Sequence, residues 1–237
     1  KVRRPLIDMS KASAEHIPGD PARMLARATD EFIRARYKDR NAEHQDTTCV
    51  NVIDSAGNMF SATPSGAWFP AVVAGETGIP LGQRAQSFVL TPGHPNQLAP
   101  HKRPRITLTP TLALKEKKPW LAFSTPCGDS QDQTLLQVFL NIQEFGMNPQ
   151  EAVEAPRFDS GAMYSSFDAH EDEPLVLQLE KRIPESVADQ LRQRGHKVTM
   201  QGEWGNSCAP TAVEFDPANG VIKAGADVRG HRYAVAW

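Results

Sequence analysis

Two hydrophobic patterns follow one another along the chain, and the change falls at the bond between Asp46 and Thr47. Over residues 20–40 the apolar side chains recur at helical spacing on one stripe, which contains Met24, Leu25, Ala28, Phe32, Ile33 and Tyr37. From Thr47 the apolar positions alternate as in a strand, and the motif DSAGN (54–58) predicts a turn before a second strand over 59–63. The sequence therefore predicts a surface helix before Asp46 and a β-hairpin after it.

After a loop rich in glycine and proline, predicted strands and helices follow to the end of the chain. Strands are predicted over 105–114, 120–126, 175–180, 196–201, 211–215 and 221–227. Helices are predicted over 130–145, from the N-cap Asn148, and over 183–194. This order favours sheets covered by helices over a regular βαβ alternation.

The two helices in the middle of the chain carry specific signals. The helix over 130–145 is expected to face a sheet with its apolar side chains Leu135, Leu136, Phe139 and Ile142. In the next helix Asn148 is the predicted N-cap, Pro149 occupies the first helical position, and Glu151 follows three residues after the cap. These signals predict a capping box at the start of the second helix.

Charge and composition exclude several classes of function. The 26 basic and 28 acidic residues give a net charge of −2, which offers no electrostatic reason to expect nucleic acid as a partner. No apolar run approaches the roughly 18 residues of a membrane-spanning helix, so membrane insertion is not predicted. The three cysteines, Cys49, Cys127 and Cys208, show no metal-binding spacing, so neither a disulfide framework nor a metal site is expected.

Thr47 opens the first strand of the hairpin, and this position suggests a chemical role. A threonine hydroxyl is a weak nucleophile near neutral pH, but the α-amine of a chain-terminal threonine, with a pKa of about 8, can serve as its general base. That chemistry requires cleavage of the bond after Asp46. On composition alone a Thr-Thr pair at a strand start is usually structural, so both interpretations remain open at this point.

Several segments, taken together, resemble the γ-glutamyltransferase family. The stretch DTTCVNVIDSAGNMFSAT (46–63) resembles the start of the family's small subunit. Further segments resemble the family in the same order: AGETGIPLGQRAQSF, APHKRPRITLTPTLAL, STPCGDSQDQ, GMNPQEAVEAPRF and GADVRGHRYAVAW. The resemblance implies that residues 1–46 are the C-terminal tail of a large subunit and that residues 47–237 are the small, catalytic subunit.

The family consists of N-terminal-nucleophile (Ntn) hydrolases, so the resemblance implies an α+β fold, a four-layer αββα sandwich. It implies autocleavage between Asp46 and Thr47, and an amidohydrolase or acyltransferase that forms an acyl-enzyme on Thr47 without a cofactor. The implied partners are the large subunit of the same precursor and a small γ-glutamyl or acyl-amide substrate, as in glutathione metabolism.

The resemblance also assigns roles within the site. Thr47 is the expected nucleophile, and Ser65 falls where the family places a hydroxyl that hydrogen-bonds the nucleophile. Cys127 and Gly128 occupy the two glycine positions of the family's oxyanion-binding turn, where backbone N–H groups stabilise the developing charge. Cys127 as a nucleophile in its own right is the weaker alternative, because no Cys–His arrangement surrounds it in the sequence.

The chain departs from the family where the glutamyl head group binds. Ser87 falls near the position of the acid that holds the α-amine, and Arg84 falls at a nearby glutamine position. Ile106 and Thr107 replace the paired serines that hold the α-carboxylate. These changes favour a substrate with an acid but no free amine. The alternatives to a γ-glutamyl enzyme are an acylase-type relative that prefers non-glutamyl acyl amides and an inactive family member that acts as a binding module.

Overall fold

The computed structural model describes residues 7–15, 19–20, 25–26, 47–67, 72–167 and 169–236. Strands β1 (Gly19–Asp20) and β2 (Leu25–Ala26) form a short antiparallel pair. The helix predicted over 20–40 is therefore wrong at these residues, and the rest of that range lies outside the described residues. Asp20 precedes a proline, and a residue in that position is disfavoured in the helical region.

The centre of the molecule is a four-stranded antiparallel sheet in the order β11-β10-β6-β5. Its strands are β5 (Thr111–Lys115), β6 (Lys118–Ser124), β10 (Thr211–Asp216) and β11 (Val221–Ala226). Glu116 and Lys117, both at positive φ, form the two-residue turn between β5 and β6. The four strands predicted over 105–114, 120–126, 211–215 and 221–227 are confirmed, although β5 begins later than the pattern suggested.

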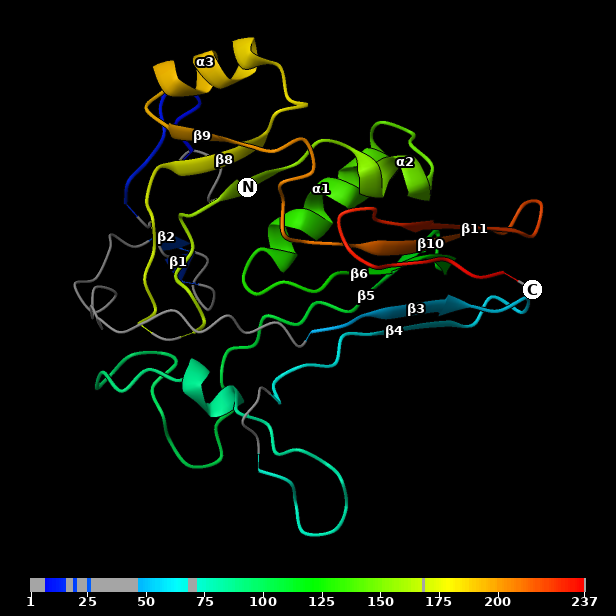
Figure 1. Cartoon of the computed structure of the whole chain (residues 1–237), viewed down its shortest axis with the longest axis horizontal. Coiled ribbons are helices and arrows are strands. Elements are labelled where there is room, and N and C mark those ends of the chain that lie inside the picture. The colour runs from blue at the N-terminus through cyan, green and yellow to red at the C-terminus, as the bar shows by residue number, and fades with distance from the viewer. Residues whose placement is uncertain are drawn as a thin grey trace.

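The predicted hairpin forms a second β layer on one face of this sheet. Strands β3 (Val50–Ile53) and β4 (Met59–Ala62) pair in antiparallel register and contact β6 and β10. Helices α1 (Gln131–Gln143) and α2 (Pro149–Glu154) lie over the other face (Figure 1). The described chain thus supplies a helical layer and two β layers, which confirms the α+β class.

Helix α1 packs on the sheet, but one predicted contact is wrong. Leu135, Val138 and Ile142 are buried against Trp120, Phe123 and neighbouring core residues. Phe139 lies beside Trp120 and Phe123, with ring centroids 5.8 and 6.1 Å away. Leu136 is 58% exposed, because one residue along a helix turns the side chain by about 100° away from the buried stripe.

A smaller three-stranded sheet lies beside the first and contains β7 (Phe158–Ser160), β8 (Val176–Glu180) and β9 (Lys197–Gln201). Helix α3 (Glu185–Gln193) connects the parallel strands β8 and β9 and, with these two strands, forms one local βαβ unit (Figure 1).

Two local predictions have different outcomes. The predicted capping box of helix α2, formed by Asn148 and Glu151, is present. The sequence pattern missed β7, because three residues are too few to show an alternation.

Candidate active site

The hairpin brings the predicted nucleophile and its predicted partner together. Thr47 lies three residues before β3, and Ser65 lies three residues after β4. The pairing extends beyond the strands through a hydrogen bond of 3.2 Å from Thr48 N–H to Pro64 O. The Thr47 Oγ1 and Ser65 Oγ atoms lie 2.8 Å apart, within hydrogen-bond distance. The register of the hairpin therefore creates this hydroxyl pair.

Arg84 places a positively charged guanidinium group beside the Thr47–Ser65 hydroxyl pair. Its Nη2 donates to Ser65 Oγ at 2.9 Å, and its Nη1 donates to Thr107 Oγ1 at 3.3 Å. The guanidinium carbon lies 5.5 Å from the centre of the Phe167 ring. Gly66, at φ 104°, allows this approach, since a Cβ there would lie 2.9 Å from Arg84 Cγ. The result is a continuous chain of contacts from Arg84 through Ser65 to Thr47.

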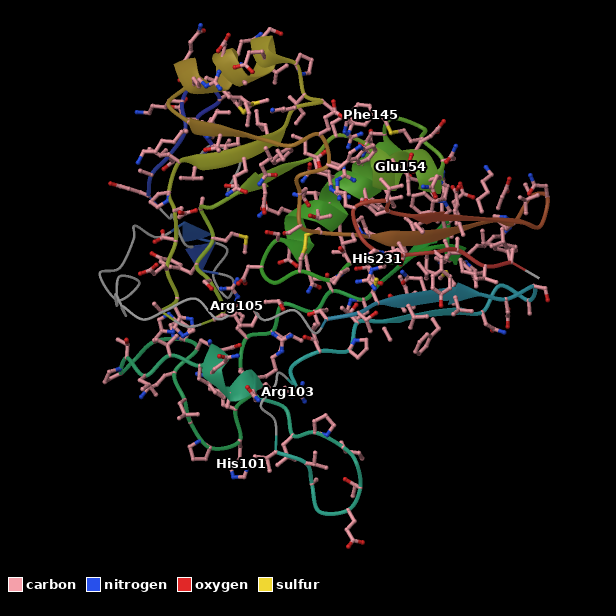
Figure 2. All side chains as sticks on the ribbon, viewed as in Figure 1. His101, Arg103, Arg105, Phe145, Glu154 and His231 are labelled. Carbon is pink, nitrogen blue, oxygen red and sulfur yellow. A yellow bond between two sulfur atoms is a disulfide. The ribbon has the colours of Figure 1, made fainter. Side chains whose placement is uncertain are left out.

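Thr47 lines a cleft of about 610 Å³. Its walls come from the turn after β6, the segment before β10 and the C-terminal segment. The other described residues that line the cleft are Pro126, Cys127, Gly128, Ser130, Ser207, Ala209, Arg229, Gly230, His231 and Arg232. Figure 2 labels His231, which marks the C-terminal wall. Arg232 Nη1 also donates to Thr48 Oγ1 at 3.1 Å. The predicted site residues did not include this C-terminal wall.

The turn after β6 has the properties expected of an anion-binding turn. Cys127 has a φ of 97° and Gly128 a φ of 27°. No described residue accepts a hydrogen bond from the backbone N–H of either residue. Two N–H groups that donate to no described residue therefore border the cleft that contains Thr47, and such groups can bind a developing oxyanion.

Cys127 forms a disulfide with Cys208, which the sequence did not predict. The reason is topological: β6 pairs with β10 so that Ser124 opposes Thr211, and residues just beyond these ends meet, with Cα atoms of the two cysteines 5.3 Å apart. The cysteine count predicted no disulfide framework and gave no sign of this single bond. The alternative that Cys127 acts as a thiolate nucleophile is wrong, because its sulfur is bonded to Cys208. Cys49 is a free cysteine.

A buried ionic cluster lies beside the cleft, and the sequence interpretation assigned it no role. Arg157 pairs with Asp227 at 2.6 Å and Arg229 pairs with Glu180 at 2.6 Å, and all four side chains are at most 1% exposed. Burial lowers the pKa of Arg157 to about 10, while the Asp227 carboxylate opposes that shift. Burial alone would raise the pKa of Glu180, but the hydrogen bond and charge of Arg229 outweigh it and lower the pKa.

The four residues predicted to bind the substrate head group, Arg84, Ser87, Ile106 and Thr107, do not point into one common site. Arg84 and Thr107 contact each other beside Ser65. Ser87 is buried, and its hydroxyl has no hydrogen-bond partner among the described residues, whereas Ile106 is 57% exposed. None of the four is among the described residues that line the Thr47 cleft. Their assignment as substrate contacts stays a prediction, with direct geometric support only for the pair next to Ser65.

The described residues show neither a metal centre nor a membrane-spanning helix. No group of three or more histidine, cysteine, aspartate or glutamate side chains in the described part of the chain is placed to hold a metal ion. In the same part of the chain, no helix has the length and apolar character needed to cross a membrane.

Comparison with known proteins gives consistent matches. The sequence model of the family described as Gamma-glutamyltranspeptidase matches residues 1–237. The chain is 33% identical over 193 residues to the glutathione hydrolase-like YwrD proenzyme of Bacillus subtilis strain 168, a match that covers 80% of this chain and 35% of the relative. It is 34% identical to the acylase ACY 1 proenzyme of Pseudomonas sp. strain V22, over 74% of this chain and 29% of the relative.

A solved structure described as LmbA2991T421A has the same fold, with a TM-score of 0.86 and 37% identity over 99% of this chain and 42% of that chain. The chain spans about a third of the length of the curated relatives that it matches. The family match along the chain and the similarity in fold lead to the same conclusion: the chain belongs to the gamma-glutamyltranspeptidase family.

Proposed function

We propose that this chain carries the catalytic part of a γ-glutamyltransferase-like Ntn amidohydrolase or acyltransferase. In this proposal a precursor is cleaved between Asp46 and Thr47, and Thr47 becomes the first residue of the small subunit. Relatives named as proenzymes support the processing step. The observation that carries the proposal is the 2.8 Å contact between Thr47 Oγ1 and Ser65 Oγ beside a turn whose N–H groups have no acceptor among the described residues.

The proposed reaction uses Thr47 as both nucleophile and base. The freed α-amine of Thr47 takes the hydroxyl proton, and Oγ1 attacks the carbonyl carbon of an amide. The N–H groups of Cys127 and Gly128 stabilise the negative charge that forms on the carbonyl oxygen. The α-ammonium returns the proton to the leaving amine, and water or a second amine then releases the acyl group from Thr47.

In the proposed mechanism Arg84 orients the hydroxyl pair. Ser65 Oγ accepts a hydrogen bond from Arg84, and in this mechanism its O–H donates to Thr47 Oγ1. That donor stabilises Thr47 Oγ1 as its negative charge grows. It also leaves the Thr47 hydroxyl proton directed toward the α-amine.

The proposed substrate is an acyl amide whose acyl part bears a carboxylate and no free amine, such as a glutaryl amide. Among the described lining residues of the cleft, the ionisable side chains are Arg229, His231 and Arg232, and none is acidic. A substrate ammonium would find no carboxylate among these lining residues, and Arg84, which contacts Thr47 through Ser65, would add positive charge beside the site. A relative named as an acylase supports a non-glutamyl acyl group.

The test compares glutaryl and γ-glutamyl p-nitroanilide on the processed full-length protein. Each polar contact missing for a glutamyl head group costs about 1–3 kcal/mol, and about 1.4 kcal/mol corresponds to a factor of ten in rate. We therefore expect kcat/KM to favour the glutaryl compound by about tenfold or more. Higher activity on the γ-glutamyl compound would refute the proposed substrate class.

A further inference from the structure

Cys127 adopts a backbone conformation that its side chain disfavours. It has a φ of 97°, a region that glycine enters freely and that other L-residues rarely occupy. The turn has weak internal support, because the Gln131 N–H reaches Gly128 O only at 3.5 Å and the N–H groups of Cys127 and Gly128 have no acceptor among the described residues. Contacts from outside the turn therefore hold it in place. Asp129 accepts hydrogen bonds from Arg105 and Ser166 on one side of the turn, and the disulfide to Cys208 holds Cys127 itself.

The disulfide joins this turn to a rigid anchor. Cys208 is fully buried, and its carbonyl accepts a hydrogen bond of 2.7 Å from Arg157 Nη2. Its N–H donates to Asn206 Oδ1 at 3.0 Å, and the Asn206 N–H donates to Glu180 Oε1 at 3.2 Å. Cys208 is thus fixed to the buried ionic cluster, whereas Cys127 borders the cleft. The disulfide between them is drawn as a yellow bond in Figure 2.

We propose that Cys208 is a positioning residue for the oxyanion turn, acting through its disulfide to Cys127, and that reduction of this disulfide lowers the rate of acyl transfer. The inference rests on the proposed function. With the bond intact, Cys127 stays at positive φ and its N–H and that of Gly128 border the cleft. With the bond broken, Cys127 relaxes toward negative φ, and the peptide planes on either side of it rotate.

The redox step needs a dithiol as the reductant. A thiolate of the dithiol attacks the half-buried Cys127 sulfur, and the Cys208 sulfur leaves as a thiolate and takes a proton. The second thiol of the reductant then displaces Cys127, which leaves and is protonated in turn. Two electrons and two protons pass to the cysteines, and the dithiol becomes a cyclic disulfide.

Two variants separate positioning from general support of the fold. Cys208→Ser leaves an untethered Cys127 that must hold positive φ alone. Loss of an oxyanion donor lowers kcat by about 100- to 1,000-fold, so a misplaced turn should lower kcat by about tenfold or more. KM should stay within about twofold, as expected for a contact made only in the transition state. The double variant Cys127→Gly with Cys208→Ser should recover most of the lost kcat, because glycine occupies positive φ without a tether.

The same inference is tested on the unaltered full-length protein with dithiothreitol. The expected result is a reversible fall in kcat and faster deuterium exchange in the peptide over residues 125–131. Cys49→Ser serves as the control for the remaining thiol and should respond to dithiothreitol as the parent does. The double variant should show no response of kcat to the reductant.

The outcomes separate the two proposals. Equal kcat and equal exchange in the oxidised and reduced parent, once loss of the disulfide is verified by mass, overturn the positioning role. A double variant as impaired as Cys208→Ser also overturns it, since the disulfide would then act only on general stability. If the oxidised parent turns over no acyl amide, the proposed function fails, while the exchange over residues 125–131 still decides whether the disulfide holds the turn.

Discussion

At the scale of single residues, the contact between Thr47 Oγ1 and Ser65 Oγ assigns the most specific chemistry to Thr47. We expect Thr47→Ala to fold, to remain uncut and to show no turnover, because it removes the atom that attacks in both processing and acyl transfer. N-terminal sequencing after incubation and a p-nitroanilide assay measure the two effects. The neighbouring Thr48→Ala is the matched control and should still be cleaved. A small chain beginning at residue 47 in the Thr47→Ala variant would refute the assignment.

A second prediction concerns Arg84, whose guanidinium group contacts Ser65. Arg84→Gln removes the charged donor to Ser65 and Thr107. Hydrogen bonds that involve a charged group contribute about 1.5–3 kcal/mol, so kcat/KM for a glutaryl anilide should fall by about tenfold or more. Arg103→Gln, which changes an exposed arginine labelled in Figure 2, is the control and should retain the parent value. Equal values for both variants would mean that Arg84 has no role at the site.

At the scale of elements, helix α1 offers a test of which face supports the sheet. Leu135 is 5% exposed and belongs to the core cluster, whereas Leu136 is 58% exposed. Truncation of a buried leucine to alanine costs about 2–5 kcal/mol of unfolding free energy, and an exposed site usually changes it by less than about 0.5 kcal/mol. Urea denaturation of Leu135→Ala and Leu136→Ala should show this contrast. Similar losses in the isolated chain would contradict the packing of α1.

At the scale of the whole molecule, the buried ionic cluster connects the two sheets. Glu180 ends β8 of the three-stranded sheet, and Arg229 and Asp227 follow β11 of the four-stranded sheet. Removal of one partner leaves a buried charge without compensation, which costs about 3–5 kcal/mol. We expect Glu180→Gln to lower the unfolding free energy by about this amount at pH 7, measured by urea denaturation.

The pH dependence of that loss follows from the lowered pKa of Glu180. Burial opposes the shift, but Arg229 lowers the pKa below its ordinary value, so the ionised form stabilises the folded state. The stabilisation is complete above the unfolded pKa of about 4.3 and is lost as the pH falls through the folded pKa. The difference between parent and Glu180→Gln should therefore shrink below about pH 4. A difference that stays constant from pH 7 to pH 3 would exclude this electrostatic origin.

Features that depend on neighbours along the chain could be predicted from residue order alone. The hairpin after Thr47, the capping box at Asn148 and the helix ending before Gly195 follow from local turn, cap and periodicity signals, and the structure contains all three. The Thr47–Ser65 contact was also predictable, because the family resemblance placed Ser65 where a hydroxyl hydrogen-bonds the nucleophile. Leu136 was misplaced because periodicity alone defines the buried stripe only to within one residue.

Contacts between residues far apart in the sequence became known only from the folded structure. The Cys127–Cys208 disulfide, the contact of Arg84 with Ser65 and the ion pairs between Glu180 and Arg229 join segments far apart in the sequence. Each of these contacts depends on the register of strand pairing or on the packing of one layer against another. Strand register and layer packing between distant segments leave no local signal in the order of residues. The cysteine spacing in particular carried no information until β6 was paired with β10, because a disulfide requires proximity in space and the two cysteines lie 81 residues apart in sequence.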